Sequence, residues 1–294
     1  MSTPIVISIA SMALFDLDEG HSIYQHQGID AYAKHQILHE DDPLGPGMAF
    51  PLIKKLLAMN TPEKKRFEVT LISRNSADTG LRIFNSIEHH QLPISKAGFT
   101  SGRSPNAYLK AFGSHLFLSE NHNDIRAALS GNFAAARVLS SNPSNESSPE
   151  LRIAFDGDSV LFSDDSERIY QEQGLDVFLA NEKKQALNTL KDGPFKNFLS
   201  AIHDIQQDYP NRDNCPIRTA LVTARCAPAH ARVVHTLRAW GIRIDEAFFL
   251  GGLGKADVLK AFQADIFFDD QQAHCDSASE HVTTAHVPHG IMND

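Results

Sequence analysis

Two pairs of aspartates follow apolar stretches in the C-terminal half of the chain: Asp156 and Asp158 come after LRIAF, and Asp269 and Asp270 come after IFF. The carboxyl ends of parallel strands meet in the crevice where such sheets bind ligands, so we expect three or four of these carboxylates to lie together. Ionised carboxylates crowded in this way repel one another, and a divalent cation resolves the conflict. Mg²⁺ takes one or two carboxylates, several waters and a substrate phosphate. The pattern therefore predicts a Mg²⁺ site that receives a phosphate group.

A hydroxyl and an ammonium group complete this set. Thr223 ends the apolar run TALVT, and Lys255 follows a glycine-rich turn at the expected start of a helix. A helix N-terminus and an ammonium group both favour a bound phosphate. Each feature alone is common in proteins, but the four features together, in this order, indicate phosphoryl chemistry.

The composition excludes several other classes of function. The chain has 294 residues, with 36 acidic against 27 basic side chains and a formal charge of −9, which disfavours binding to a nucleic acid polymer. Three cysteines without a CxxC pair favour a reducing compartment, so we expect a cytoplasmic protein. Because no apolar run approaches the roughly 20 residues that span a bilayer, we expect no membrane partner. The first apolar run, IVISIA, is expected to be a buried strand and not a signal peptide.

The two halves of the chain resemble each other. ALFDLDEGHSIYQHQGIDAY in the first half matches VLFSDDSERIYQEQGLDVF in the second, and three further blocks match in the same order, with shifts of 146 to 150 positions. Each half alternates β-rich runs with helix-length patterns, which predicts parallel strands with crossover helices. The Ser, Pro and Asn-rich stretch 140–150 is the expected linker, giving units 1–147 and 148–294. Whether the two units share one sheet or face each other stays open.

Further motifs extend the argument to a family. FDGDSV, LVTAR, GK and FFDDQ resemble the four motifs of the haloacid dehalogenase (HAD) phosphohydrolase superfamily. FDGDSVLFSDDSERI, CPIRTALVTAR, HEDDPLGPGMAFP, SPNAYLKAF and TTAHVPHGI are similar to the cytosolic type I 5′-nucleotidase family, and this resemblance covers nearly the whole chain. It implies a HAD-like, Rossmann-like α/β fold that is internally duplicated. It also implies Mg²⁺-dependent hydrolysis of nucleoside 5′-monophosphates such as AMP, IMP or deoxynucleotides, and assembly as a homo-oligomer.

The resemblance also implies roles for individual residues. Asp156 would be the nucleophile that forms an aspartyl-phosphate. Asp158 would first protonate the leaving ribose oxygen and then activate water, and its backbone carbonyl would bind the metal. Thr223 and Lys255 would hold the phosphoryl oxygens.

The remaining motif positions would bind the metal and the substrate. Asp269 and Asp270 would hold Mg²⁺ directly or through water, and we favour Asp269 as the direct ligand. Their neighbours in the other motifs are candidate substrate-binding residues: Gly157, Ala224 and Arg225.

The first half lacks most of this set, so we expect one active site. In the repeat alignment Asp156 falls on Ile9, Asp158 on Ser11, Lys255 on Pro105 and the acidic pair on Ser119 and Glu120. The first half would then supply packing, an interface or part of a nucleoside pocket. Residues 163–216 resemble a small helical cap over the crevice, although scaffold is an equal alternative because the first half has a similar stretch.

Other functions fit the motifs as well. The protein could be a different small-molecule phosphatase of the same superfamily, or a phosphotransferase that passes the phosphoryl group to a nucleoside. A non-catalytic nucleotide sensor is the alternative outside enzymes, and the motifs disfavour it because a sensor needs neither a nucleophile nor an acid/base.

Overall fold

The computed structural model describes residues 3–139, 148 and 150–293, and their strands form one sheet. The first half supplies β1 (Ile5–Ile9), β2 (Phe67–Ser73), β3 (Lys96–Phe99), β4 (Leu116–Ser119) and β5 (Ala134–Val138). The second half supplies β6 (Leu151–Phe155), β7 (Ile217–Thr223), β8 (Glu246–Phe249), β9 (Ile266–Asp269) and β10 (Thr284–His286).

The sheet is ten-stranded, in the order β3-β2-β1-β4-β5-β10-β9-β6-β7-β8. Neighbouring strands are parallel within each half, and the antiparallel pair β5–β10 joins the halves. The expected α/β fold with a mainly parallel sheet is confirmed, and the halves share one sheet. The expected linker falls mainly on residues 140–147 and 149, which lie outside the described residues.

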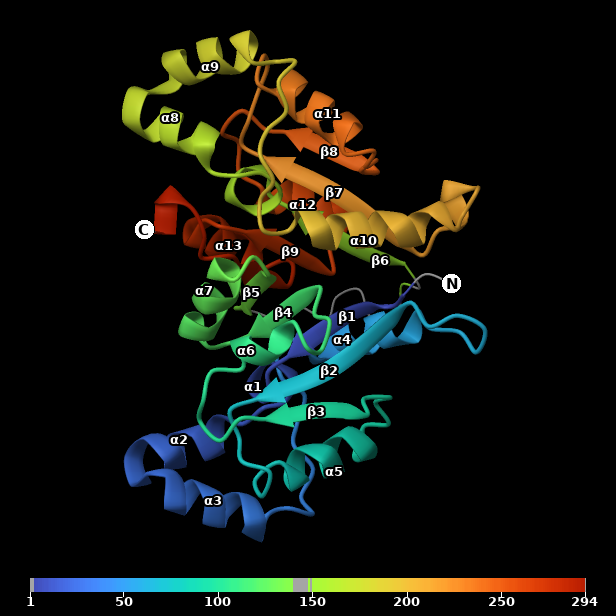
Figure 1. The fold of residues 1–294 in the computed structure, drawn as a ribbon, viewed down its shortest axis with the longest axis vertical. Helices are drawn as coiled ribbons and strands as arrows, with labels where there is room; N and C mark the ends of the chain where they lie inside the picture. Colours follow the sequence, from blue (N-terminus) through green and yellow to red (C-terminus); the bar gives the residue numbers. More distant parts are fainter. Residues whose placement is uncertain (1–2, 140–147, 149, 294) are drawn as a thin grey trace.

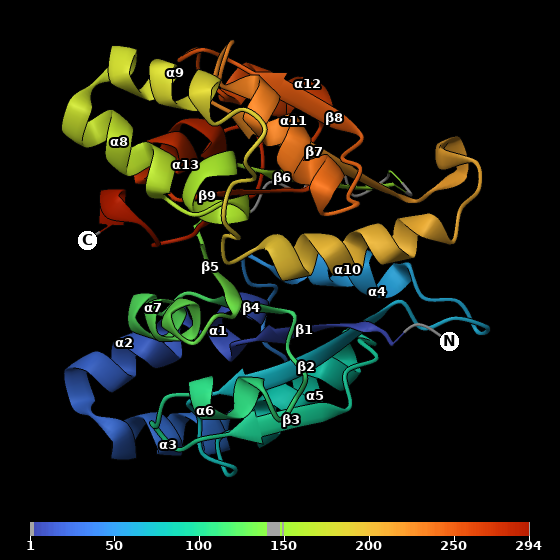
Figure 2. The ribbon, with the colours of Figure 1, turned by 45° about the horizontal axis from the view of Figure 1, so that its top comes forward.

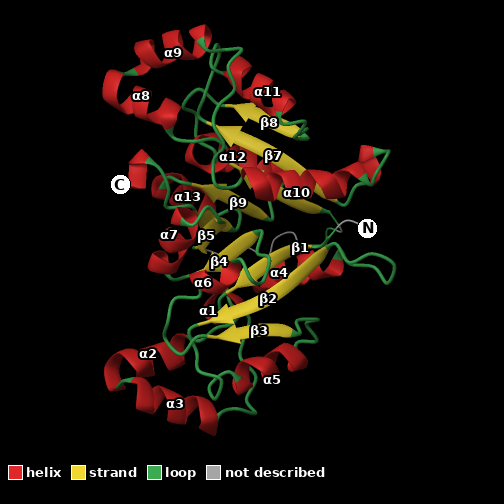
Figure 3. Ribbon diagram, viewed as in Figure 1, coloured by secondary structure: helices red, strands yellow, loops and turns green. Residues whose placement is uncertain are grey.

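The helices follow the same order in both halves and pack around the sheet (Figures 1 and 3). The first half has α1 (Ser11–Leu14), α2 (Asp18–Gln27), α3 (Ile29–Leu38), α4 (Phe50–Ala58), α5 (Leu81–His89), α6 (Asn106–Leu109) and α7 (His122–Ser130). The second has a π-helical turn (Gly157–Leu161), α8 (Asp165–Gln173), α9 (Leu175–Lys184), α10 (Lys196–Gln207), α11 (His230–Ala239), α12 (Ala256–Phe262) and α13 (Gln272–Ser279). No helix among the described residues has the length and apolar character needed to cross a membrane.

The expected cap stretch 163–216 divides into two parts. The hairpin of α8 and α9 lies at the edge of the molecule, while α10 lies nearer the middle (Figure 2). Phe198, Leu199 and Ile202 of α10 belong to the main core. Helix α10 therefore packs as scaffold, which is the alternative that the sequence left open for the stretch 163–216. The first half has a matching hairpin of α2 and α3, on the same side of the molecule in Figure 1.

Contacts beyond the sheet also join the two halves. The main hydrophobic cluster draws buried residues from both, including Ile7 and Phe117 of the first and Phe155 and Phe268 of the second. In addition, Lys55 Nζ lies 2.6 Å from Asp265 Oδ1, and both side chains are largely buried. A continuous core makes the two sequence repeats one packed unit.

An aromatic cluster lies beneath the strand ends that carry the aspartates. Phe155 and Phe268, the residues before Asp156 and Asp269, stack with ring centroids 5.6 Å apart. Phe195 packs on Phe268 at 4.8 Å, and all three rings are fully buried. Close-packed rings leave little freedom to the backbone that follows. The cluster therefore fixes the positions from which the two carboxylates project.

Replacing a ring of this cluster should cost stability. For Phe268→Ala we expect the free energy of unfolding to fall by about 3–5 kcal/mol, because the change opens a cavity in a packed core. The control Leu187→Ala removes a side chain that is 82% exposed and should have an effect within about 0.5 kcal/mol. Urea denaturation followed by circular dichroism measures both, and equal losses would contradict this account of the core.

Candidate active site at the ends of strands β6, β7 and β9

Three adjacent strands carry the predicted residues to one edge of the sheet. Asp156 follows β6, Thr223 ends β7 and Asp269 ends β9, and β6 pairs with both neighbours in parallel. Carboxylate oxygens of Asp156, Asp269 and Asp270 lie within 4.8 Å of one another, and all three residues are buried. The structure thus brings together the nucleophile candidate and both acids of the last motif.

Lys255 lies between two of these carboxylates. It immediately precedes α12, and its Nζ is 2.7 Å from Asp156 Oδ1 and 2.6 Å from Asp269 Oδ2. Burial lowers the pKa of Lys255, but the two ion pairs outweigh burial and hold that pKa above its usual value. The lysine therefore stays protonated and offsets part of the negative charge.

The two acids of the last motif have different environments. Asp269 Oδ1 accepts a hydrogen bond from the backbone N–H of Gln271 at 2.8 Å, and Oδ2 pairs with Lys255. Burial raises the pKa of Asp269, but Lys255 and His274 outweigh burial and lower it overall. Asp270 Oδ1, in contrast, is buried and has no hydrogen-bond partner among the residues that the structure describes.

The remaining charge of the cluster is not compensated by the protein. Burial, reinforced by Asp156 and Asp269, raises the pKa of Asp270 to about 9. Burial also raises the pKa of Asp156 to about 7, although Lys255 opposes the shift. The protein by itself therefore does not keep all three carboxyl groups ionised, and the all-oxygen cluster has the donor set that suits a hard divalent cation.

Asp158 does not join the three carboxylates. Its side chain receives a two-pronged ion pair from Arg225, with Nε 2.7 Å from Oδ2 and Nη2 2.6 Å from Oδ1. Arg225 is therefore engaged by a catalytic candidate, and not free for substrate, in this state. Such a fork fixes the orientation of the carboxylate as well as its charge.

A buried glutamate that sequence reasoning missed completes this arrangement. Glu182 of α9 accepts a hydrogen bond from Arg225 Nη1 at 2.6 Å and another from Arg232 Nη1 at 2.8 Å. Burial lowers the pKa of Arg225, but Asp158 and Glu182 outweigh burial and hold it above its usual value. The only sequence signal was weak: Glu182 lies four residues after Phe178, so it shares the buried face of the helix.

The turn after β6 is strained and tightly held. Ser159 has φ of +63°, a conformation that costs energy in a residue other than glycine. His289 Nδ1 lies 3.1 Å from the carbonyl oxygen of Ser159, and a Cβ at Gly290 would come within 2.4 Å of the Ser159 hydroxyl. The close approach of residues 289–290 thus requires glycine and braces the turn that carries Asp158.

The other predicted substrate-binding residues line the same turns. A Cβ at Gly157 would lie 3.3 Å from Thr223 Oγ1, so the glycine lets the two turns approach closely. Thr223 Oγ1 also accepts a hydrogen bond from the backbone N–H of Arg225 at 3.3 Å. Ala224, between them, is exposed and offers only its backbone to a ligand.

The pairing of the strands shows that one position in the alignment of the two halves, the counterpart of Asp156, is wrong. Ala10 N–H donates to the carbonyl of Leu118, as Asp156 N–H donates to the carbonyl of Phe268. Ala10, and not Ile9, is therefore the counterpart of Asp156. The alignment slipped because the next turn has four residues in α1 and five in the π-helical turn.

The aligned positions of Lys255 and Asp269 agree with the structure. Pro105 precedes α6 as Lys255 precedes α12, and Ser119 ends β4 as Asp269 ends β9. The first half therefore has neither a carboxylate at the nucleophile position nor a cation at the lysine position.

Comparison with known proteins places the chain in a family. A family model described as 5′-nucleotidase matches residues 1–294. Human cytosolic 5′-nucleotidase 1B is 37% identical over 286 residues, which cover 93% of this chain and 47% of the human protein. The chain thus spans about half the length of this curated relative. On these matches, the chain belongs to the 5′-nucleotidase family.

Proposed function

We propose that this protein hydrolyses nucleoside 5′-monophosphates to nucleoside and inorganic phosphate. The observation that carries the proposal is the group of three buried carboxylates at the ends of adjacent strands, two of which Lys255 bridges, in a chain of the 5′-nucleotidase family. The printed name of the human relative is also that of a 5′-nucleotidase.

Asp156 acts as the nucleophile in this proposal. Its carboxylate attacks phosphorus, the bond from phosphorus to the ribose 5′ oxygen breaks, and Asp158 donates a proton to that oxygen. Asp158 then accepts a proton from water while the water oxygen attacks phosphorus, and the bond from phosphorus to the Asp156 carboxylate breaks, which releases phosphate and restores Asp156. Lys255 and Thr223 hold the phosphoryl oxygens during both steps. Gly157, Ala224 and the backbone of Arg225 border the same space.

A divalent cation, proposed to be Mg²⁺, fits beside Asp156 and Asp270. Support comes from the buried, unpartnered oxygen of Asp270, whereas both oxygens of Asp269 already have partners. We therefore favour Asp270 over Asp269 as a direct ligand, which revises the expectation from sequence. The ion would supply positive charge to the phosphate and the carboxylates. The backbone carbonyl of Asp158 stays a proposed third protein ligand.

We further propose that the halves derive from a duplicated HAD-like unit, with domains 1–147 and 148–294, and that only the second is catalytic. The matching order of helices and the mirrored strand order about β5 and β10 support this. The α8–α9 hairpin is the proposed cap. A cytoplasmic location and a homo-oligomeric state stay predictions.

Phosphate release tests the proposed function. Wild-type protein with Mg²⁺ should release phosphate from nucleoside 5′-monophosphates, and Asp156→Asn should lower kcat by at least about a thousandfold, because the nucleophile is lost. The control Asp257→Asn changes an exposed carboxylate on α12 and should keep wild-type activity. Release from sugar phosphates alone would indicate a different phosphatase. Saturable binding without release would indicate a sensor, and near-normal activity of Asp156→Asn would contradict the mechanism.

Metal titration tests the assignment of Asp270. Asp270→Asn should raise the Mg²⁺ concentration for half-maximal activity by at least about tenfold, since it removes a ligand. Calorimetric titration with Mg²⁺ should show weaker binding for the same variant. An Asp269→Asn variant that weakens Mg²⁺ binding while Asp270→Asn leaves it unchanged would reverse the assignment.

Glu120, the counterpart of Asp270 in the first half, makes the free energy of unfolding depend on pH. Burial, reinforced by Asp18, raises the pKa of Glu120 to about 7. A carboxyl group whose pKa is raised by folding lowers stability as pH rises from its unfolded pKa through its folded pKa. Glu120→Gln should therefore increase the free energy of unfolding at pH 8 and change it little at pH 5. Urea denaturation at both pH values measures this, and an equal effect at both would contradict the cause.

A further inference from the structure

We propose that Glu182 is a positioning residue that sets the orientation of Asp158 through Arg225. The inference rests on the proposed function, in which Asp158 is the acid and base. It links the α8–α9 hairpin to the proton transfer at the sheet edge.

Glu182 is shielded from solvent, and its carboxylate contacts other side chains of the protein. Its side chain is fully buried, and both carboxylate oxygens are used. Oε2 accepts from Arg225 at 2.6 Å, while Oε1 accepts from Arg232 at 2.8 Å and from the Ser166 hydroxyl at 2.9 Å. A buried charge persists only when paired in this way.

The arginine between the two acids is held from several sides. Arg225 uses Nε and Nη2 for Asp158 and Nη1 for Glu182, and its guanidinium carbon lies 5.5 Å from the ring centre of Phe178. Phe178 and Glu182 both belong to α9, on its buried face. Helix α9 therefore fixes the guanidinium plane, and the plane fixes the Asp158 carboxylate. Asp158, Arg225, Glu182 and Arg232 form a chain of alternating charge.

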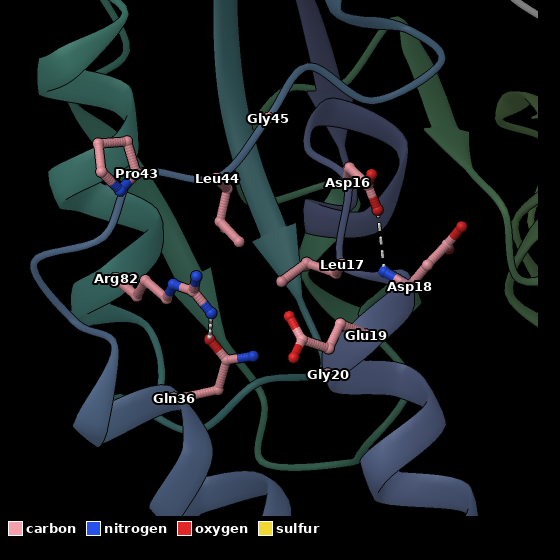
Figure 4. Close-up of a pocket in the computed structure, with 10 residues that line it drawn as sticks. All are labelled: Asp16, Leu17, Asp18, Glu19, Gly20, Gln36, Pro43, Leu44, Gly45 and Arg82. Carbon is pink, nitrogen blue, oxygen red and sulfur yellow. Dashed lines mark hydrogen bonds between the residues drawn. The ribbon is translucent and has the colours of Figure 1, made fainter.

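The first half provides an internal comparison. Gln36 is the eighth residue of α3, as Glu182 is the eighth of α9, and Asn75 follows β2 by two residues, as Arg225 follows β7. Figure 4 shows Gln36 accepting a hydrogen bond from Arg82, the counterpart of Arg232, at 3.3 Å.

Neutral amides thus replace the charge pair in the half that has Ala10 at the nucleophile position. Asn75 there accepts a hydrogen bond from the Tyr32 hydroxyl at 3.1 Å, and the same helical hairpin still forms. The α2–α3 hairpin therefore forms with uncharged amides at these two positions. The charged pair occurs in the half that carries Asp158, which indicates that the pair serves Asp158.

Turnover of Glu182→Gln tests the inference. We expect kcat for a nucleoside 5′-monophosphate to fall by about 10- to 100-fold with little change in KM, because the acid is misplaced but substrate contacts remain. The first-turnover burst of p-nitrophenolate from p-nitrophenyl phosphate should change little, since that leaving group needs no proton. Asp176→Asn, an exposed change on the same helix, should match wild type in both assays. Equal losses with both substrates would indicate a structural role and overturn the inference.

A double variant separates positioning from folding. Glu182→Gln with Arg225→Asn introduces the amides that the first half carries at the corresponding positions, Gln36 and Asn75. Its kcat should equal that of Arg225→Asn alone, because Glu182 acts only through Arg225. If the kcat losses of the two single variants multiplied in the double variant, or if Glu182→Gln had the kcat of wild type, the inference would be overturned and the proposed function would stand. A wild-type protein that releases no phosphate from nucleotides would overturn both.

Discussion

A single buried ammonium group between two buried carboxylates organises the C-terminal half of this protein. Lys255 contacts Asp156 and Asp269 at 2.7 and 2.6 Å, and with Asp270 nearby the protein supplies one cation for three acids. Such an excess of negative charge away from water is costly, and natural proteins tolerate it where a ligand or ion completes the balance. We therefore propose that a divalent cation completes the charge balance at this site.

The rest of the fold holds this charge in place. Parallel strands β9, β6 and β7 deliver their carboxyl ends to one edge, and the rings of Phe155 and Phe268 anchor the backbone beneath the aspartates. The turn after β6 carries a strained Ser159 that Gly290 braces from the C-terminal segment. Strain of this kind persists only where surrounding structure fixes it, and it is typical of functional sites.

The two halves show how one scaffold carries different chemistry. Both have their strands and main helices in the same order, and both carry a helical hairpin beside the strand ends. Acids and bases are replaced by small or neutral residues in the first half: Ala10, Asn75, Pro105 and Ser119 take the places of charged residues. The second half thus differs from the first in the charge buried at the strand ends and not in its architecture, and function belongs to the site and not to the fold.

The sequence alone determined the elements and the residues that meet at the sheet edge. Apolar runs ending in Asp156, Thr223 and Asp269 predict parallel strands, and parallel strands place their ends together, so local pattern was sufficient there. Only the tertiary structure decided the single sheet, the core position of α10 and the partners of Asp158. Glu182 lies 43 positions from Arg225 in the sequence. Their contact depends on how α9 packs beside α11 and the turn after β7, which no local pattern encodes. Likewise, the unpartnered oxygen of Asp270 distinguishes it from Asp269 because hydrogen bonding is decided by neighbours in space.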